Sequence, residues 1–248
     1  FAYSQIELRL ADVLSDDKKL REIFINDEDV HRAVAAEVFD VSPNNVEYEM
    51  RRRAKVINFG ILFPLLIIPM GVLGATVTYN TLAGYNGLET SQGILLLSAL
   101  ALATYLTGNS WLSLIAVFMV ASLIAFYFYN KFPAKVFPGD VLTYSVGALI
   151  ATMAILGNYE RIAVFVFIPY ILETILKLRG KLDKHSFAKV REDGSLEVPY
   201  KKIYGLTHLS VFLLGKIKRR VHERDVTYLI FWFQIIICII AFFLFRGG

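Results

Sequence analysis

The sequence predicts a mostly α-helical, polytopic membrane bundle of about six transmembrane helices. A cytoplasmic hairpin and an amphipathic helix are expected within it, and a small, mainly helical soluble segment precedes it. The mean hydropathy of +0.52 and the 56% hydrophobic content are too high for an ordinary soluble domain, and they exclude a disordered chain. The charge divides sharply: residues 1–60 carry nine basic and twelve acidic side chains, whereas residues 61–248 carry 17 and ten. The single cysteine, Cys238, excludes a disulfide framework and a thiolate metal cluster.

The first sixty residues read as a soluble segment. The expected elements are a strand at about 3–9 and helices near 16–25, 29–39 and 43–59. Ser15 and Ser42 are candidate N-caps, and Pro43 suits a first helical position. Because the chain starts with Phe1 rather than Met, we expect a fragment, and residues 1–60 contain no apolar run that could be a secretory signal.

Long uncharged runs follow, each close to the roughly 20 residues that a helix needs to cross a bilayer. Five such runs are Ile61–Tyr79, Thr90–Thr107, Trp111–Asn130, Val141–Asn158 and Val226–Phe245. A sixth, Ile162–Leu176, is interrupted by Glu173 near its end. The alternative, a soluble protein with buried core helices, is disfavoured by so many runs in so short a chain.

Basic residues assign the loops to sides of the membrane. The loop at 177–225 holds 13 of the 26 basic residues, Lys131 and Lys135 lie two helices earlier, and the loops between carry none before Arg161. By the positive-inside rule, alternate loops are cytoplasmic. The loops assigned to that side are 80–90, 130–140 and 177–225.

The last of these loops is expected to be structured. Asp193-Gly194 between β-branched residues predicts a hairpin over Val190–Val198. Residues 201–221 predict an amphipathic helix on the membrane surface. Its apolar stripe is Ile203, Leu206, Leu209, Leu213 and Ile217, and its basic cluster, which favours anionic lipid, is Lys216, Lys218, Arg219 and Arg220.

Asp140 stands at the membrane surface, at the start of a predicted helix. The helix dipole favours a carboxylate there, and the side chain could simply cap free amides. The functional alternative is a hard-metal ligand, because Mg²⁺ takes one or two protein oxygens and completes its shell with water and phosphate. Asn80 is a second suitable oxygen donor, assigned to the same side.

Three motifs occur in order between the predicted helices. They read Asn80-x-x-Ala-Gly-x-Asn-Gly-Leu-Glu89, Phe132-Pro-Ala-Lys-Val-Phe-x-Gly-Asp140 and Val221-His-Glu-Arg224. Over about residues 66–246 the chain resembles the eukaryotic and archaeal N-acetylglucosamine-1-phosphate transferases of the polyprenyl-phosphate sugar-1-phosphate transferase superfamily. Asn86-Gly87, where the bacterial branch is expected to have Asp-Gly, fits the dolichol-type branch better.

The resemblance implies an activity. A lipid phosphate would attack the β-phosphate of UDP-N-acetylglucosamine, giving lipid-pyrophosphoryl-N-acetylglucosamine and UMP, the first step of lipid-linked oligosaccharide synthesis for N-glycosylation. The implied cofactor is Mg²⁺, with Mn²⁺ as the alternative. The implied partners are UDP-N-acetylglucosamine, a dolichyl-type polyprenyl phosphate, membrane lipids and a second copy of the chain. Phosphoryl transfer depends mainly on positioning and charge neutralisation, which fits an interfacial site.

The same resemblance implies roles for individual residues. Asn80 and Asp140 match the metal and pyrophosphate site, and both would be catalytic. Gly84, Asn86 and Phe137 match the uridine pocket, with Phe137 stacking on the base.

Glu89 follows in the first motif and is expected to shape its loop. Lys184 and His185 fall where the family has an Arg-His-Arg cluster that holds the sugar and pyrophosphate, but Ser186 leaves one basic residue fewer. The alternative for His185 is a solvated loop histidine. The family's N-terminal helices and paired aspartates are not matched, since residues 61–248 contain no Asp-Asp pair. We therefore expect half of an active site, inactive by itself.

The N-terminal segment carries a different resemblance. The segments Ala2-Tyr-Ser-Gln-Ile-Glu-Leu-Arg9 and 49–60 resemble motifs A and B of family A DNA polymerases, and His31 also matches a position of that family. Arg51, Lys55 and Phe59 would then lie on one helix face toward a nucleotide triphosphate. Ala2 stands where that family has its metal-binding aspartate, so we favour a basic face with no ligand and do not expect DNA binding.

These observations predict two domains, a partial polymerase palm and fingers segment over 1–63 and a partial membrane transferase over 64–248. The resemblances meet near Phe63-Pro64 without a linker, which indicates a chimera. The competing functions are a vestigial nucleotide-binding segment on a membrane anchor and a non-catalytic, transporter-like bundle. Polar motifs gathered on one side, rather than at the bilayer midplane, favour the transferase.

Overall fold

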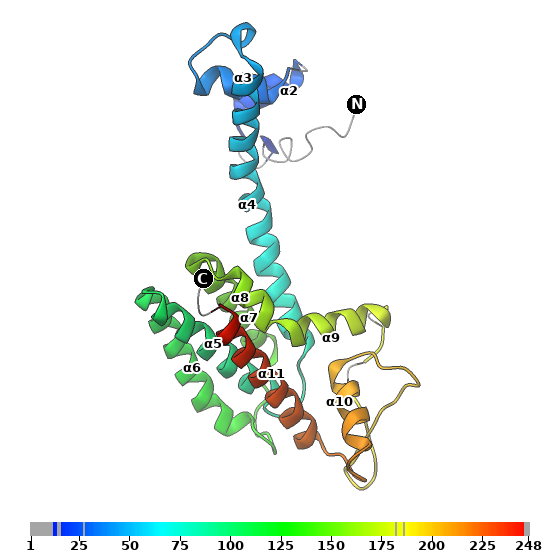
Figure 1. The fold of residues 1–248 in the computed structure, drawn as a ribbon. Helices are drawn as coiled ribbons and strands as arrows, with labels where there is room; N and C mark the ends of the chain where they lie inside the picture. The colour runs from blue at the N-terminus through cyan, green and yellow to red at the C-terminus, as the bar shows by residue number, and fades with distance from the viewer. Residues whose placement is uncertain (1–11, 14–15, 27, 182, 186, 246–248) are drawn as a thin grey trace. The chain divides into compact units, whose positions relative to one another are not determined.

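The computed structural model describes residues 12–13, 16–26, 28–181, 183–185 and 187–245, and over 58–66 it describes the backbone alone. It divides into two compact units, Phe1–Met70 and Gly71–Gly248, which we describe separately. The prediction of a mostly helical membrane protein is confirmed (Figure 1).

The first unit begins with two short capped helices. α2 (Lys18–Ile25) and α3 (Val30–Val38) start after Asp17 and Asp29, whose carboxylates accept hydrogen bonds from backbone N–H groups of the first turn. Both helices lie where the sequence predicts them. The cap of α2 is Asp17, because its Oδ1 accepts the N–H groups of Lys19 and Leu20. The candidate cap Ser15 and the predicted strand at 3–9 lie outside the described residues.

The prediction of a helix starting at Pro43 is wrong. Pro43–Asn45 forms one 3-10 turn, and Ser42 makes no side-chain cap bond. Val46 is extended, with φ −72° and ψ 113°, and therefore ends that turn before the long helix α4 (Tyr48–Thr81) begins. The predicted helices at 43–59 and 61–79 are thus one helix, which contributes residues to both units.

Seven helices and a hairpin follow α4 in the described part of the second unit. They are α5 (Leu88–Leu106), α6 (Ser110–Asn130), α7 (Gly139–Gly157), α8 (Glu160–Val166), α9 (Ile168–Arg179), β1 (Lys189–Val190), β2 (Leu196–Glu197), α10 (Leu206–Gly215) and α11 (Glu223–Phe245). α5 packs against α6, α7 and α11, and Figure 1 shows these helices side by side.

Among the described helices, α6, α7 and α11 are long and apolar enough to cross a membrane. The predicted sixth span is not a single helix, because the helix is interrupted at Phe167 between α8 and α9. Pro169 has no N–H to continue the α8 hydrogen-bond ladder, but it is tolerated in the first turn of α9. Neither helix is long enough to span a bilayer.

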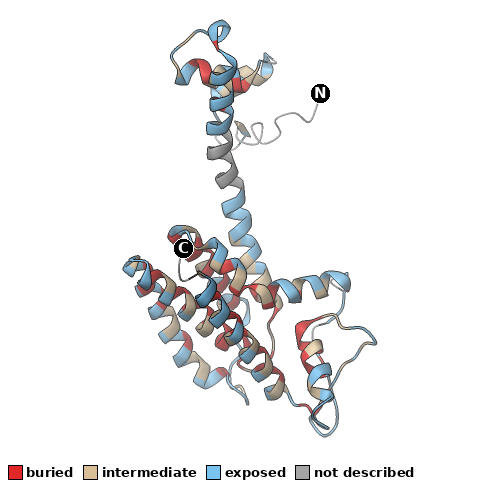
Figure 2. Cartoon of the chain, in the orientation of Figure 1, coloured by how far each residue is buried: buried red, intermediate tan, exposed pale blue. Residues whose placement is uncertain are grey.

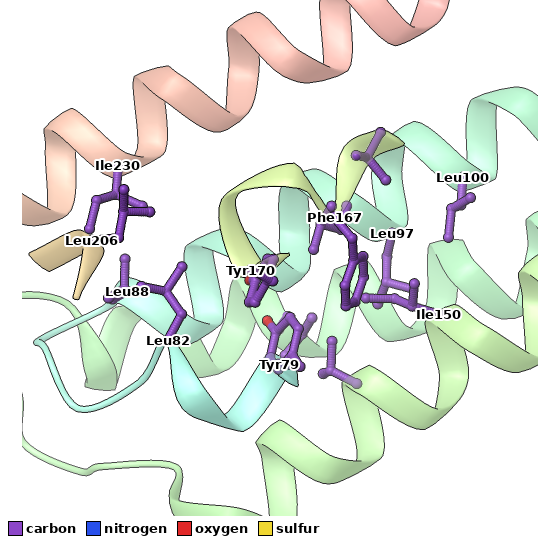
Figure 3. Close-up of a cluster of buried hydrophobic side chains, with 14 of the residues drawn as sticks. Tyr79, Leu82, Leu88, Leu97, Leu100, Ile150, Phe167, Tyr170, Leu206 and Ile230 are labelled. Carbon is purple, nitrogen blue, oxygen red and sulfur yellow. The ribbon is translucent and has the colours of Figure 1, made fainter. Parts of the chain in front are cut away.

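The core of the second unit lies between these helices (Figures 2 and 3). At its centre the rings of Tyr79 and Tyr170 stack with centroids 5.0 Å apart, and both side chains are fully buried. Leu97 and Ile150 join them from α5 and α7. The outward faces of α6 and α11 instead expose large apolar residues, such as Phe118 and Trp232, as expected of lipid-facing surfaces.

The predicted hairpin is confirmed, since β1 and β2 pair antiparallel with Val190 opposite Leu196, and Gly194 adopts φ +75° in the turn. The predicted amphipathic helix over 201–221 is wrong in length and in its buried face. α10 spans only Leu206–Gly215, and Ile217 is 86% exposed. Its buried residues are Leu206, Thr207, His208, Ser210 and Val211, because this face packs against polar groups of α9 and the preceding loop.

Candidate functional site

Three loops that are distant in the sequence meet at one end of the second unit. The side-chain amide of Asn86 donates to Glu223 Oε1 over 2.6 Å, and its Oδ1 accepts the Ala134 N–H over 2.6 Å. Lys177 Nζ donates to the carbonyl oxygen of Thr81. These contacts bring the loops 80–90, 130–140 and 177–225 together, and their assignment to the cytoplasmic side of the membrane stays a prediction.

A cavity of about 390 Å³ opens among these loops. It is lined by six of the eight residues for which the family resemblance implies a transferase role. Its lining residues are Asn80, Thr81, Ala83, Gly84, Glu89, Gly139, Asp140, Thr143, Lys177, Lys184, His185 and Phe187.

Two oxygen-bearing side chains come from α4 and α7. Asn80 lies in the last turn of α4, where Thr143 Oγ1 donates to its Oδ1 over 2.8 Å and its Nδ2 donates to Tyr144 Oη over 3.3 Å. Asp140 is exposed in the first turn of α7, one turn before Thr143. The N-cap of α7 is Pro138 and there is no side-chain cap bond, so the capping alternative for Asp140 is not supported. Thr143 therefore fixes the amide of Asn80 beside the turn that carries Asp140.

Glu89 closes the inner wall of the cavity. It lies in the first turn of α5, before the apolar run, and its carboxylate accepts the Gly84 N–H while Oε2 has no hydrogen-bond partner among the described groups. Burial raises the pKa of this carboxyl. Gly84 adopts φ +101°, and a Cβ at this position would overlap the Phe187 ring. Only glycine fits this turn beneath Phe187.

Cationic side chains form another part of the wall. Lys184 and His185 are exposed, and Lys184 Nζ lies 5.5 Å from the centroid of the Tyr200 ring. Lys177 also lines the cavity and pairs with Glu173 one turn earlier in α9. Sequence reasoning missed Lys177 and Thr143. The signal for Lys177 was its position four residues after Glu173, a charged residue inside an apolar run. The signal for Thr143 was its position one turn after Asp140.

Two predicted site residues lie outside the cavity lining. Phe137 is 53% exposed in the loop before α7. Asn86 is held by α11 and by the 130–140 loop, because Glu223 Oε1 accepts from both its backbone N–H and its side-chain amide. In this structure Asn86 joins three segments that bound the site.

The residues of the polymerase-like face belong to the first unit. Arg51 Nε donates to Asp29 Oδ2 over 2.7 Å, so this guanidinium is already paired. Lys55 is exposed on the same helix, one turn later. The side chain of Phe59 lies outside the described residues. The interpretation of this face as a basic surface without a ligand therefore stays a prediction.

Changing Asn86 to Asp is expected to destabilise the second unit by about 1–3 kcal/mol, because a carboxylate would replace the amide that donates to the Glu223 carboxylate. The measurement is thermal unfolding of the detergent-solubilised protein. The double variant N86D/E223Q should recover stability, since the new amide can donate to the new carboxylate. Equal stability of N86D and the unmodified protein would contradict this account of the contact.

The donor set fits a hard divalent cation. Asp140 offers a carboxylate, Asn80 an amide oxygen, and Glu89 Oε2 lacks a hydrogen-bond partner in the described part of the chain. No group of three or more His, Cys, Asp or Glu side chains able to hold a metal occurs among the described residues. A cation here would need oxygens from water and phosphate as well, which is the usual coordination of Mg²⁺.

Comparison with known proteins gives consistent results. The profile of glycosyl transferase family 4 matches residues 33–158, a range that overlaps the end of the polymerase-like segment. A protein of Saccharolobus solfataricus provisionally named UDP-N-acetylglucosamine–dolichyl-phosphate N-acetylglucosaminephosphotransferase is 40% identical over 187 residues, which are 75% of this chain and 56% of the relative. A Sulfolobus acidocaldarius protein with the same provisional name is 31% identical over 75% of this chain and 55% of its own length.

A bacterial protein is also similar. The phospho-N-acetylmuramoyl-pentapeptide-transferase of Clostridium perfringens is 34% identical over 133 residues, which are 50% of this chain and 42% of the relative. The chain thus spans about half the length of the curated relatives it matches.

Proposed function

Because this chain belongs to glycosyl transferase family 4, we propose that it forms part of an enzyme that transfers N-acetylglucosamine 1-phosphate from UDP-N-acetylglucosamine to a dolichyl-type polyprenyl phosphate. The reaction would release UMP and start lipid-linked oligosaccharide synthesis for N-glycosylation. One observation carries the proposal: a single cavity collects Asn80, Gly84, Glu89, Asp140, Lys184 and His185 from three separate loops.

In the proposed reaction an oxygen of the lipid phosphate bonds to the β-phosphorus of the nucleotide sugar. The bond between that phosphorus and the bridging oxygen breaks, and UMP leaves with the bridging oxygen. Asp140 and Asn80 would hold Mg²⁺, or Mn²⁺ in its place, which supplies positive charge against the pyrophosphate. Thr143 keeps Asn80 oriented toward this position through the 2.8 Å bond to its Oδ1. Lys184 and His185 would contact the sugar and pyrophosphate from the opposite loop.

We propose that uridine lies next to the glycine turn at Gly84, with Phe137 stacking on the base. Asn86 would then lie at the edge of this uridine pocket, since its side-chain amide also joins α11 to the loops. The 13 basic residues in the 177–225 loop support a multi-pass protein with the cavity toward the cytoplasm. Association into a homodimer stays a prediction.

We separately propose that the first unit is a polymerase-derived segment joined to the transferase segment. The division of the structure at Met70 and Gly71, close to the predicted join at residues 63 and 64, supports it. The family match from residue 33 weighs against a join as late as residue 63. Long-read sequencing of the source DNA across codons 55–75 tests it. A break in the reads there establishes an artificial join, and a continuous frame excludes one.

UMP release tests the transferase function. Membranes containing this chain, alone and together with the part of the Saccharolobus relative that it does not match, are supplied with UDP-N-acetylglucosamine, polyprenyl phosphate and MgCl₂. We expect no release from the chain alone and release from the combination, because the paired aspartates of the family would come from the second piece. The intact relative is the positive control. If it releases UMP and both preparations of this chain do not, the proposal is wrong.

A further inference from the structure

We propose that Lys177 is a phosphate-binding residue of this cavity and that Glu173 is its positioning residue. The inference rests on the proposed function, since it names the group of this chain that holds a phosphate oxygen of either substrate. Neither residue belongs to the three sequence motifs; Glu173 lies at the middle of α9 and Lys177 in its last turn.

The first argument is where each end of the ion pair lies. Lys177 Nζ is 3.5 Å from Glu173 Oε1. The lysine side chain is 18% exposed and lines the cavity, whereas the glutamate side chain is 0% exposed and does not line it. The pair therefore presents its positive end to the cavity and encloses its negative end.

The second argument is that the Lys177 ammonium is held in place but still has hydrogen-bond donors available for a ligand. Its ammonium donates to the carbonyl oxygen of Thr81 at the end of α4, and its contact with Glu173 is longer than a hydrogen bond. An ammonium has three N–H donors, so the group still has capacity for an anion. Because its position is fixed before the ligand arrives, little side-chain entropy is lost on binding.

The third argument concerns Glu173. Its Oε2 accepts the N–H of Leu206, the first residue of α10, and its Oε1 faces Lys177. One carboxylate thus orients the lysine and satisfies a free N–H at the start of α10. Burying an unpaired charge is costly, and these two contacts therefore stabilise the Glu173 carboxylate within the largely apolar α9.

The alternative is that Lys177 only ties α4 to α9. A purely structural lysine would affect stability without distinguishing ligands that carry phosphate from ligands that do not. Ligand binding by the full chain in lipid nanodiscs with MgCl₂ separates these roles. The probes are UDP-N-acetylglucosamine, uridine and farnesyl phosphate, each titrated by calorimetry.

For Lys177→Met we expect about tenfold weaker binding of a phosphate-bearing probe and unchanged binding of uridine, because one charge-assisted hydrogen bond is lost. A loss confined to UDP-N-acetylglucosamine assigns Lys177 to the pyrophosphate, and a loss confined to farnesyl phosphate assigns it to the lipid. Lys177→Arg should retain most of the affinity. Lys189→Met, which removes an exposed cation of β1 outside the cavity, should bind like the unmodified protein.

Unchanged affinity of Lys177→Met for both phosphate-bearing probes would overturn the inference and leave the proposed function standing. Equal losses for uridine and the phosphate-bearing probes would also overturn it, since they indicate a structural role. If the unmodified chain binds neither phosphate-bearing probe, the inference fails together with the substrate assignment on which it rests. Thermal unfolding of every variant shows whether the fold is retained.

Discussion

Replacing Asp140 with asparagine is expected to lower UMP release by about 10²–10³-fold while the protein keeps its fold. The side chain is exposed, lines the cavity and caps no helix, so the amide costs little stability. The substitution preserves size and one oxygen but removes the negative charge that would hold Mg²⁺ against the pyrophosphate. The measurement is UMP release from the combined preparation, with the unmodified chain assayed in parallel.

The matched control is Glu160→Gln. It removes one negative charge at the start of α8, which follows the far end of α7 from Asp140. This variant should release UMP at the rate of the unmodified chain. If Asp140→Asn also retains that rate, Asp140 does not hold the metal and the proposed site must be revised. Raising the MgCl₂ concentration should recover part of the Asp140→Asn activity if the defect is weaker metal binding.

The positions of most helices, and six of the twelve residues that line the cavity, could be predicted from sequence because the signals are local. A run of about 20 apolar residues determines a span, and the motif around Asn80 or Asp140 can be recognised without knowing what it touches. The break between α8 and α9 was missed, because the run around Pro169 was predicted as one helix, although a proline is a signal for such a break. Turn residues such as Asp193-Gly194 likewise specify a hairpin through their own backbone preferences.

What sequence reasoning missed depends on contacts between distant segments. Lys177 belongs to the site only because α9 brings it to the end of α4. Asn86 does not line the cavity, because it is bound to Glu223, which lies 137 positions later in the chain. α10 buries His208 and Ser210 because carbonyl groups of other segments and of its own first turn lie beside them. Periodicity assigns the apolar stripe to the buried face and has no information about such polar partners.

Gly147 makes the geometry of the site depend on helix packing. A Cβ at this position of α7 would lie 2.8 Å from the Cα of Thr76 and 2.9 Å from the carbonyl oxygen of Ala75, both backbone atoms of α4. Backbone atoms cannot rotate away as a side chain can, so α4 and α7 must separate. Glycine thus permits the close approach that small residues give to membrane helices. The same approach brings Asn80 of α4 within 2.8 Å of Thr143 of α7.

Gly147→Ala is therefore expected to destabilise the second unit by about 1–3 kcal/mol, even though alanine favours helix by up to about 1 kcal/mol. Gly74→Ala is the matched control, because a Cβ there meets nothing within 4 Å, and it should be neutral or slightly stabilising. Thermal unfolding in detergent measures whether Gly147→Ala lowers the stability of the protein while Gly74→Ala leaves it unchanged or raises it slightly. Because separation of α4 and α7 would also break the bond between Thr143 and Asn80, Gly147→Ala should reduce UMP release below the wild-type rate at temperatures where it is still folded. Wild-type release at such a temperature would mean that the Asn80 amide need not be fixed by α7, and that the proposed metal site tolerates movement between the two helices.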